Sequence, residues 1–147
     1  MPVKVFFNNS CNICRTEINH YKKYCDDSIK WIDVTDNKEA QNITSKSYKE
    51  LLRRMHVIQD GKVIDGAESF LIIWKNIPKY NFLYKIFKIK PLFFFLNIFY
   101  EIAAYFLFLK NKHLLKKWKR ANFQKKFAQY AINHLIGVKN GDLIGKK

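Results

Sequence analysis

The sequence predicts an α/β fold in which a central mixed sheet carries the motif Cys11-Asn12-Ile13-Cys14 at the start of the first helix. Three observations support this prediction. A β-branched and aromatic run at residues 3–7 directly precedes the motif, strand-like and helix-like segments alternate up to residue 76, and Asp60-Gly61 separates two apolar runs. A length of 147 residues with 48% hydrophobic and 16% aromatic residues suits one packed domain and argues against a disordered chain.

The first half of the chain begins with a predicted strand at residues 3–7 and a predicted helix at residues 11–24. Residues 29–34 are again β-branched and aromatic and predict a second strand, whereas the polar stretch 36–47 predicts one or two short helical pieces. Ser47-Tyr48-Lys49-Glu50 has the pattern of a capping box, in which the Ser and Glu side chains bind exposed backbone N–H groups at a helix start. This helix should run to about Arg54.

The second half begins with the strongest short-range signal for a two-residue hairpin turn, Asp60-Gly61 between residues 55–59 and 62–64. A helix then leads from Gly66 to about Asn76, where the step from Ile77 to Pro78 ends it. Beyond Pro78 we expect three helices, at residues 82–88, 91–110 and 114–135. A crossover helix that makes a parallel strand pair, followed by an antiparallel hairpin, is the arrangement of thioredoxin-like folds. The predicted fold is therefore thioredoxin-like with a helical C-terminal extension.

The position of Cys11 and Cys14 at a strand-to-helix turn predicts a redox site. Unpaired backbone N–H groups and the positive end of the helix dipole stabilise a thiolate, which is the reactive form of cysteine. Asn12 and Ile13 carry no charge, so the helix start must lower the pKa of Cys11, with the positive charge of Arg15 nearby. We expect Cys11 to attack a disulfide and Cys14 to resolve the mixed disulfide. The alternative is a pair of buried, inert cysteines.

Several segments, in order and spacing, resemble the DCC family of predicted thiol-disulfide oxidoreductases (the DUF393 domain). They are Val5-Phe6-Phe7 before Cys11-Asn12-Ile13-Cys14-Arg15, residues 54–58 with Asp60-Gly61, Gly66-Ala67 before a helix with Trp74, Ile77-Pro78, and Tyr100-Glu101-Ile102-Ala103 before Asn111-Lys112. The resemblance covers about residues 3–112. It implies a thioredoxin-like fold and disulfide exchange with a protein or a low-molecular-weight thiol, for which we expect no metal or organic cofactor.

Two positions depart from the family pattern, which usually has Asp-Gly just before the first cysteine. Here Asn8 and Asn9 stand in that place. Asparagine can still form hydrogen bonds and can adopt the left-handed backbone conformation as glycine would. The carboxylate is missing, however, which weakens any role in proton transfer at this position. We expect Asn8, Asn9 and Arg15 to contact the substrate.

Thioredoxin proteins usually place a cis-proline opposite the CxxC motif, and this chain has none there. The corresponding loop is Arg54-Met55-His56, so the resemblance implies that Met55 and His56 line the motif. His56 could pair with the Cys11 thiolate or shuttle its proton, because an imidazole titrates near neutral pH. The alternative is a structural histidine at a strand edge.

Metal binding is a further alternative, because Cys11, Cys14, His20 and Cys25 are ligand types that suit zinc. Their spacing matches none of the usual structural zinc patterns, and His20 and Cys25 should lie far from the first turn of the helix. We therefore expect no metal.

The number of cysteines bears on the compartment of the protein. Three cysteines are too few, and odd in number, for a disulfide-stapled secreted scaffold. The N-terminal residues also lack a signal-peptide pattern. The cysteine count and this missing pattern together favour a cytoplasmic setting.

Charge is distributed unevenly along the chain. Residues 1–109 have 16 Lys and Arg against 11 Asp and Glu, whereas residues 110–147 have 11 against 1, which gives +5 and +10 of the total +15. We expect a thioredoxin-like domain at residues 1–112 and a basic helical extension at residues 113–147, packed on or beside it. A solvated basic face is the simplest interpretation of the extension, and no nucleic-acid motif is present.

The dense apolar stretch at residues 92–109 only just reaches membrane-spanning length and contains Asn97 and Glu101. We expect it to be a helix that is buried against the sheet or dips into a membrane surface. Lysines on both sides leave a peripheral membrane contact open. The leading hypothesis is thus a cytoplasmic thiol-disulfide oxidoreductase, with a peripheral membrane contact left open. The rival is a non-catalytic thioredoxin-like module that binds a membrane surface or an anionic partner through its basic, aromatic C-terminal region.

Overall fold

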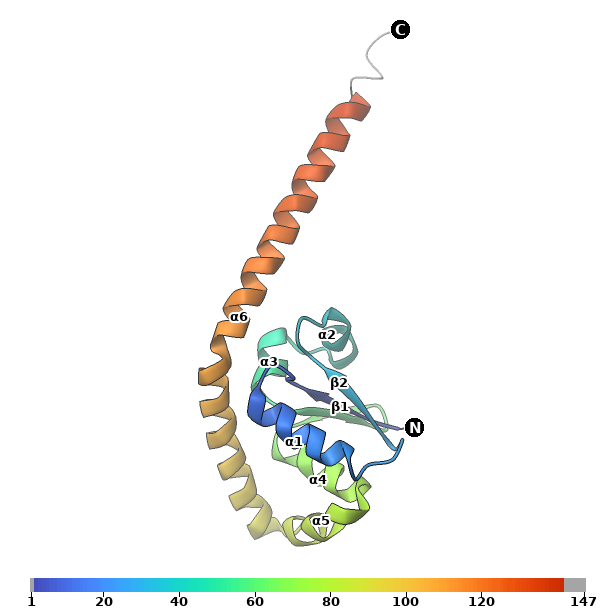
Figure 1. The fold of residues 1–147 in the computed structure, drawn as a ribbon, viewed down its shortest axis with the longest axis vertical. Helices are drawn as coiled ribbons and strands as arrows, with labels where there is room; N and C mark the ends of the chain where they lie inside the picture. Colours follow the sequence, from blue (N-terminus) through green and yellow to red (C-terminus); the bar gives the residue numbers. More distant parts are fainter. Residues whose placement is uncertain (1, 142–147) are drawn as a thin grey trace. The chain divides into compact units, whose positions relative to one another are not determined.

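The computed structural model describes residues 2–141, except for the side chains of residues 131 and 133–141. The chain divides into two compact units, Met1–Lys112 and His113–Lys147. The first unit contains a four-stranded mixed sheet with the strand order β2-β1-β3-β4 (Figure 1). Its strands are β1 (Val3–Phe7), β2 (Ile29–Asp33), β3 (His56–Gln59) and β4 (Lys62–Asp65). β1 pairs parallel with β2 and antiparallel with β3, and β3 pairs antiparallel with β4, so the α/β, thioredoxin-like fold class is confirmed.

The helices of the first unit begin and end close to their sequence signals. They are α1 (Asn12–Lys22), α2 (Lys38–Thr44), α3 (Tyr48–Arg53), α4 (Ala67–Asn76), the short 3₁₀ helix η1 (Pro78–Tyr80), α5 (Asn81–Phe87) and the first part of α6 (Lys90–Gly141). The predicted capping box is present at Ser47 and Glu50. Asp60 and Gly61 have φ values of 51° and 76°, as a tight hairpin turn requires at both central positions.

The two faces of the sheet have separate cores because side chains alternate along a strand. Val5 and Val57, both fully buried, pack in one cluster with Ile18 of α1 and Ile73 of α4. Phe6, the next residue along β1, is also fully buried but belongs to the other face. Helix α1, and with it the CxxC motif, is therefore fixed against one face of the sheet.

The structure corrects the prediction for the region after residue 90. Two helices were expected there, at 91–110 and 114–135, but α6 is one helix from Lys90 to Gly141. The intervening residues Asn111-Lys112-His113 include no proline or glycine that would end a helix. Each unit thus holds one part of α6.

Of the two alternatives expected for the apolar stretch, burial against the sheet holds for only a few of its side chains. By length and composition alone, α6 includes a segment that could cross a membrane, within Lys90–Tyr130. The most apolar window has a mean hydropathy of 1.9 and is only 6% buried. Only one side of the stretch packs on the first unit, as shown by the buried Ala104.

Candidate functional site

The CxxC motif lies at the N-terminus of α1, as predicted. Cys11 is the N-cap residue, and its Sγ accepts a hydrogen bond from the backbone N–H of Cys14 at 3.4 Å. The carbonyl oxygen of Cys11 accepts the first helical hydrogen bond, from the N–H of Arg15 at 2.9 Å. Both cysteines are free thiols. A sulfur atom in this position receives backbone dipoles that favour its negative form.

The two thiols of the motif differ in acidity. The pKa of Cys11 is lowered to about 6, first by a hydrogen bond from the Cys14 side chain and then by the backbone N–H groups of Cys14 and Ile13. The side chain of Asn111 contributes as well, and burial acts in the opposite direction. The pKa of Cys14 is raised, because its proton is held by Cys11 and because its partial burial disfavours the charged form. The first proton therefore leaves the pair from Cys11.

Arg15 does not have the role expected from its charge. Its side chain is exposed, and its Nη2 donates a hydrogen bond to Asn12 Oδ1 at 2.9 Å. The lowering of the Cys11 pKa comes from the Cys14 thiol, the helix start and Asn111 instead. The sequence pattern indicated the helix start but not Asn111, which follows Cys11 by a hundred positions and is brought to it by α6.

A pocket of about 220 Å³ opens beside Cys14. Most of its lining is apolar and comes from α1, the loop before β3 and the inner face of α6, where Met55, Tyr100 and Leu107 contribute. Asn8 and Glu17 are among its polar members. A pocket of this kind next to a thiol can hold the apolar part of a substrate whose disulfide reaches the motif.

Glu17 is a site residue that sequence reasoning missed. Its carboxylate accepts a hydrogen bond from the hydroxyl of Tyr21 at 2.8 Å, and this hydroxyl accepts one from Trp74 Nε1 at 3.0 Å. Burial raises the pKa of Glu17, and the negative charge of Cys11 raises it further. The spacing Cys14-x-x-Glu17, one turn along a helix, was the signal that could have indicated it.

Asn8 and Asn9 shape the loop that carries Cys11. The Asn8 carbonyl oxygen accepts a hydrogen bond from the Cys11 N–H at 3.3 Å, and its Oδ1 accepts one from the Ser10 N–H at 3.0 Å. The Asn9 N–H donates to Asp33 Oδ1 at 3.2 Å, which ties the loop to the end of β2. Neither asparagine has a positive φ, so the glycine-like conformation is not used. Asn8, which is 6% exposed, is the one of the two that lines the pocket.

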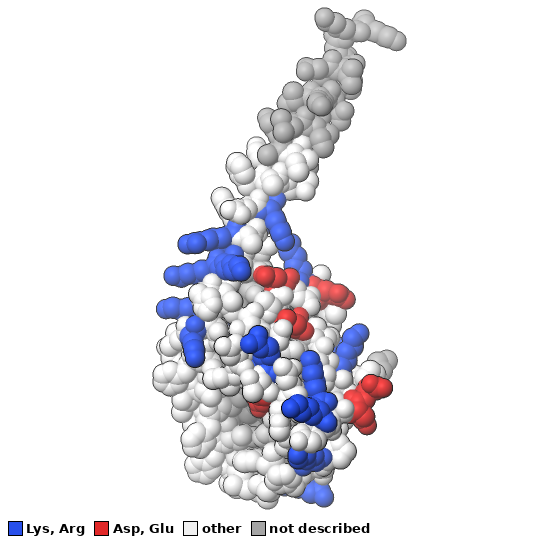
Figure 2. All heavy atoms as spheres, in the orientation of Figure 1, with Lys and Arg blue, Asp and Glu red and all other residues white. Residues whose placement is uncertain are grey.

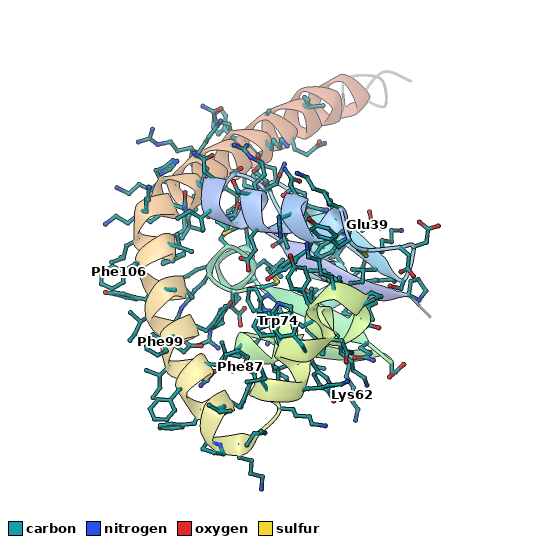
Figure 3. The ribbon with its side chains drawn as sticks, turned by 60° about the horizontal axis from the view of Figure 1, so that its bottom comes forward. Glu39, Lys62, Trp74, Phe87, Phe99 and Phe106 are labelled. Atoms are coloured by element: carbon teal, nitrogen blue, oxygen red, sulfur yellow. The ribbon has the colours of Figure 1, made fainter. Side chains whose placement is uncertain are left out.

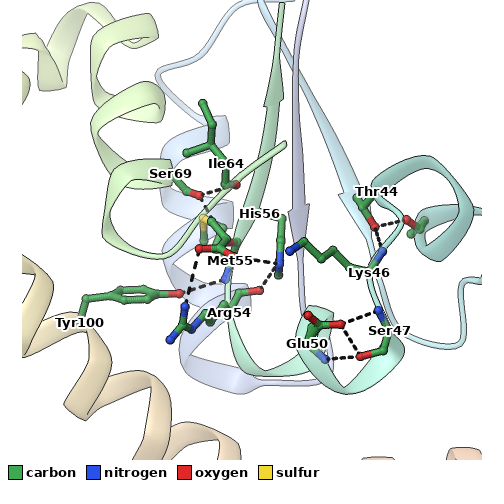
Figure 4. Close-up of polar contacts among 12 residues, drawn as sticks. Thr44, Lys46, Ser47, Glu50, Arg54, Met55, His56, Ile64, Ser69 and Tyr100 are labelled. Carbon is green, nitrogen blue, oxygen red and sulfur yellow. Dashed lines mark hydrogen bonds and ion pairs between the residues drawn. The ribbon is translucent and has the colours of Figure 1, made fainter. Parts of the chain in front are cut away.

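Met55 and His56 lie on opposite faces of the sheet. Met55 lines the pocket together with Cys14, as expected. His56 is 1% exposed on the other face, where its Nδ1 lies 2.9 Å from the carbonyl oxygen of Arg54 (Figure 4). Its Nε2 lies 3.9 Å from Asp65 Oδ2. Burial is the main cause that lowers the pKa of His56. These contacts place His56 as its structural alternative describes, whereas its service to the Cys11 thiolate stays a prediction without a contact between the two side chains in the described residues.

The residues of the zinc alternative are not gathered. His20 contacts the rings of Tyr24 and Tyr80, and the Cys25 Sγ lies 2.9 Å from the carbonyl oxygen of Asp26. Within the part of the chain that the structure describes, no three His, Cys, Asp or Glu side chains form a group that could hold a metal ion. The geometry thus gives no support to a metal centre built on the motif.

Comparison with known proteins agrees with this site. Residues 5–113 match the family model described as DCC1-like thiol-disulfide oxidoreductase, which spans the sheet, the motif and the inner part of α6. Searches of curated proteins and of solved structures found no match. The family match covers well over half of the chain and includes both cysteines of the motif. The chain belongs to the DCC1-like thiol-disulfide oxidoreductase family.

Proposed function

We propose that this protein exchanges disulfides through Cys11 and Cys14. The observation that supports this most directly is the Cys11 Sγ at the N-cap of α1, where it accepts the N–H of Cys14 beside an apolar pocket. The lowered pKa of Cys11 supplies the thiolate near neutral pH, while Cys14 keeps its proton. This combination of one ionised and one protonated thiol suits a nucleophile and a resolving group.

In the first step, the Cys11 thiolate attacks one sulfur of a substrate disulfide. The substrate S–S bond breaks, a mixed disulfide forms on Cys11, and the first substrate sulfur leaves as a thiolate that takes a proton from water. Cys11 is only 2% exposed, whereas Cys14 is partly exposed and lines the pocket. The side chain of Cys11 must therefore turn outward from its N-cap position for a bulky disulfide to reach it.

In the second step, Cys14 loses its proton and attacks Cys11 Sγ. The mixed disulfide breaks, the second substrate sulfur leaves as a thiolate, and Cys11 and Cys14 become a disulfide, so the substrate gains the two electrons that the dithiol loses. Glu17 is the nearest carboxylate along the same helix face, and the raised pKa makes it a better proton acceptor. We assign Glu17 the role of accepting the Cys14 proton.

The test is a redox titration of the whole protein in graded glutathione buffers, with free thiols mass-tagged at each point. We expect a reversible two-electron transition between roughly −270 and −200 mV. Cys11→Ser should abolish exchange, and Cys14→Ser should accumulate a mixed disulfide on Cys11. Cys25→Ser is the matched control, because Cys25 lies beyond the C-terminus of α1, at the other end of the helix from the motif. This variant should leave the transition unchanged. Full turnover in the Cys11 variant would show that the proposal is wrong. So would the absence of an intramolecular disulfide at every redox potential of the glutathione buffers.

A further inference from the structure

One face of α6 in the first unit is a continuous exposed row of hydrophobic side chains. We name this row the α6 seam. It consists of Phe95 (58% exposed), Ile98 (40%), Phe99 (70%), Ile102 (50%), Phe106 (65%) and Leu109 (38%). The spacings of three and four residues place all six on one stripe of a helix. In Figure 3, Phe99 and Phe106 point away from the sheet.

The opposite face of the same segment is already occupied. The hydroxyl of Tyr100 accepts the backbone N–H of Met55 at 3.0 Å, and Ala104 is 6% exposed. Glu101 Oε2 lies 2.7 Å from Arg54 Nη2 in an ion pair. The inner face therefore holds this segment on the rest of the first unit, and the side chains of the α6 seam lie on the outward face.

The charges around the α6 seam indicate which kind of partner binds it. Between Lys90 and Lys110 the sequence contains one charged residue, Glu101, and this residue is paired on the inner side. Lysines bound the seam at both ends, namely Lys88 and Lys90 before it and Lys110 and Lys112 after it. Figure 2 shows the corresponding lower left of the first unit as a largely uncharged area. An uncharged aromatic stripe between lysines matches the hydrocarbon and headgroup layers of an anionic lipid surface.

A second copy of the chain fits this surface less well. If the α6 seams of two copies packed in parallel, the lysines at each end of one seam would meet the same lysines of the other copy. If they packed antiparallel, Lys88 and Lys90 would meet Lys110 and Lys112. Both arrangements bring positive charges together in a protein of net charge +15.

We propose that the α6 seam docks this protein onto an anionic lipid bilayer, with α6 lying in the plane of the interface. An orientation across the bilayer would have to expose the inner face to lipid and break the contact of Glu101 with Arg54. In the interfacial orientation the Phe side chains enter the acyl boundary while the lysines remain among the headgroups. The proposal does not depend on disulfide exchange.

The test is sedimentation of the whole protein with phosphatidylcholine vesicles that contain about a third phosphatidylglycerol, compared with pure phosphatidylcholine. We expect binding to the anionic vesicles that weakens as salt is raised. The double variant Phe99→Glu/Phe106→Glu should lower the partition coefficient by about a hundredfold, since burying each phenylalanine contributes about tenfold or more. Circular dichroism should show an unchanged fold, because both side chains are exposed.

The matched control is Phe123→Glu/Phe127→Glu, which changes two equally exposed phenylalanines of α6 in the other unit, at 71% and 66%. It should change binding only a few fold. Loss of binding in this control with retention in the seam variant would move the contact to the basic extension and refute the proposal. Absence of vesicle binding by the wild type, or a dimer in light scattering that only the seam variant dissociates, would refute it as well. Binding that survives high salt and alkaline washing would overturn the interfacial orientation.

Discussion

The acidity of Cys11 yields the sharpest prediction. The pKa falls from an ordinary value of 9.0 to about 6. At pH 7 about nine tenths of Cys11 should therefore be thiolate, compared with about one hundredth for an ordinary thiol. Absorbance at 240 nm, which reports thiolate, should show a one-thiol step near pH 6 in the Cys25→Ser background, and Cys11→Ser should remove this step.

The Cys14→Ala variant separates the sources of that acidity. The hydrogen bond from the Cys14 side chain is the largest cause, so its removal should move the Cys11 midpoint upward. The backbone N–H groups of Cys14 and Ile13 remain, and they should hold the midpoint below 9.0. A wild-type step near the ordinary value, or a midpoint that does not move in Cys14→Ala, would refute the reasoning about this pair.

Three further changes test other parts of the structure. Because burial raises the pKa of Glu17 above its ordinary value of 4.5, the folded state loses stability as pH rises from 4.5 through the raised pKa. Glu17→Gln should therefore increase the free energy of unfolding more at pH 8 than at pH 4, and equal gains at both would contradict this. The same variant should slow resolution of the mixed disulfide in stopped-flow measurements, and an unchanged rate would remove Glu17 from the mechanism. Ser47→Ala should cost about 1 kcal/mol in urea unfolding because the capping box is lost, and no measurable cost would speak against the cap. Tyr100→Phe leaves the Met55 N–H without its partner and should cost about 1–3 kcal/mol, whereas a neutral result would argue against the docked inner face of α6.

Local signals explain what the sequence could predict. The capping box at Ser47 and the hairpin at Asp60-Gly61 depend on residues within four positions of each other, so their patterns sufficed. The same is true of Cys11 and Cys14, whose chemistry depends on the first turn of one helix. The fold class followed because these local elements occur in a characteristic order.

Contacts between residues that are distant in the chain explain what could not be predicted from the sequence. The hydrogen bond from Trp74 to Tyr21 joins residues 53 positions apart, and no local pattern reveals that it supports Glu17. The separation of Met55 from His56 was accessible in principle, since neighbouring residues of a strand face opposite sides. The continuity of α6 was accessible too, since residues 111–113 include no proline or glycine. The exposure of the α6 seam was not, because apolar composition alone does not tell a buried face from an outward one.

The docking of α6 onto the loop before β3 has a consequence for synthesis of the chain. Tyr100 and Glu101 follow their partners Met55 and Arg54 by 45 and 47 positions. While a ribosome is still adding these residues, the sheet and the CxxC motif have already emerged, but one wall of the pocket beside Cys14 is missing. The pocket beside Cys14 therefore gains this wall only when residues 100–107 of α6 have emerged and docked.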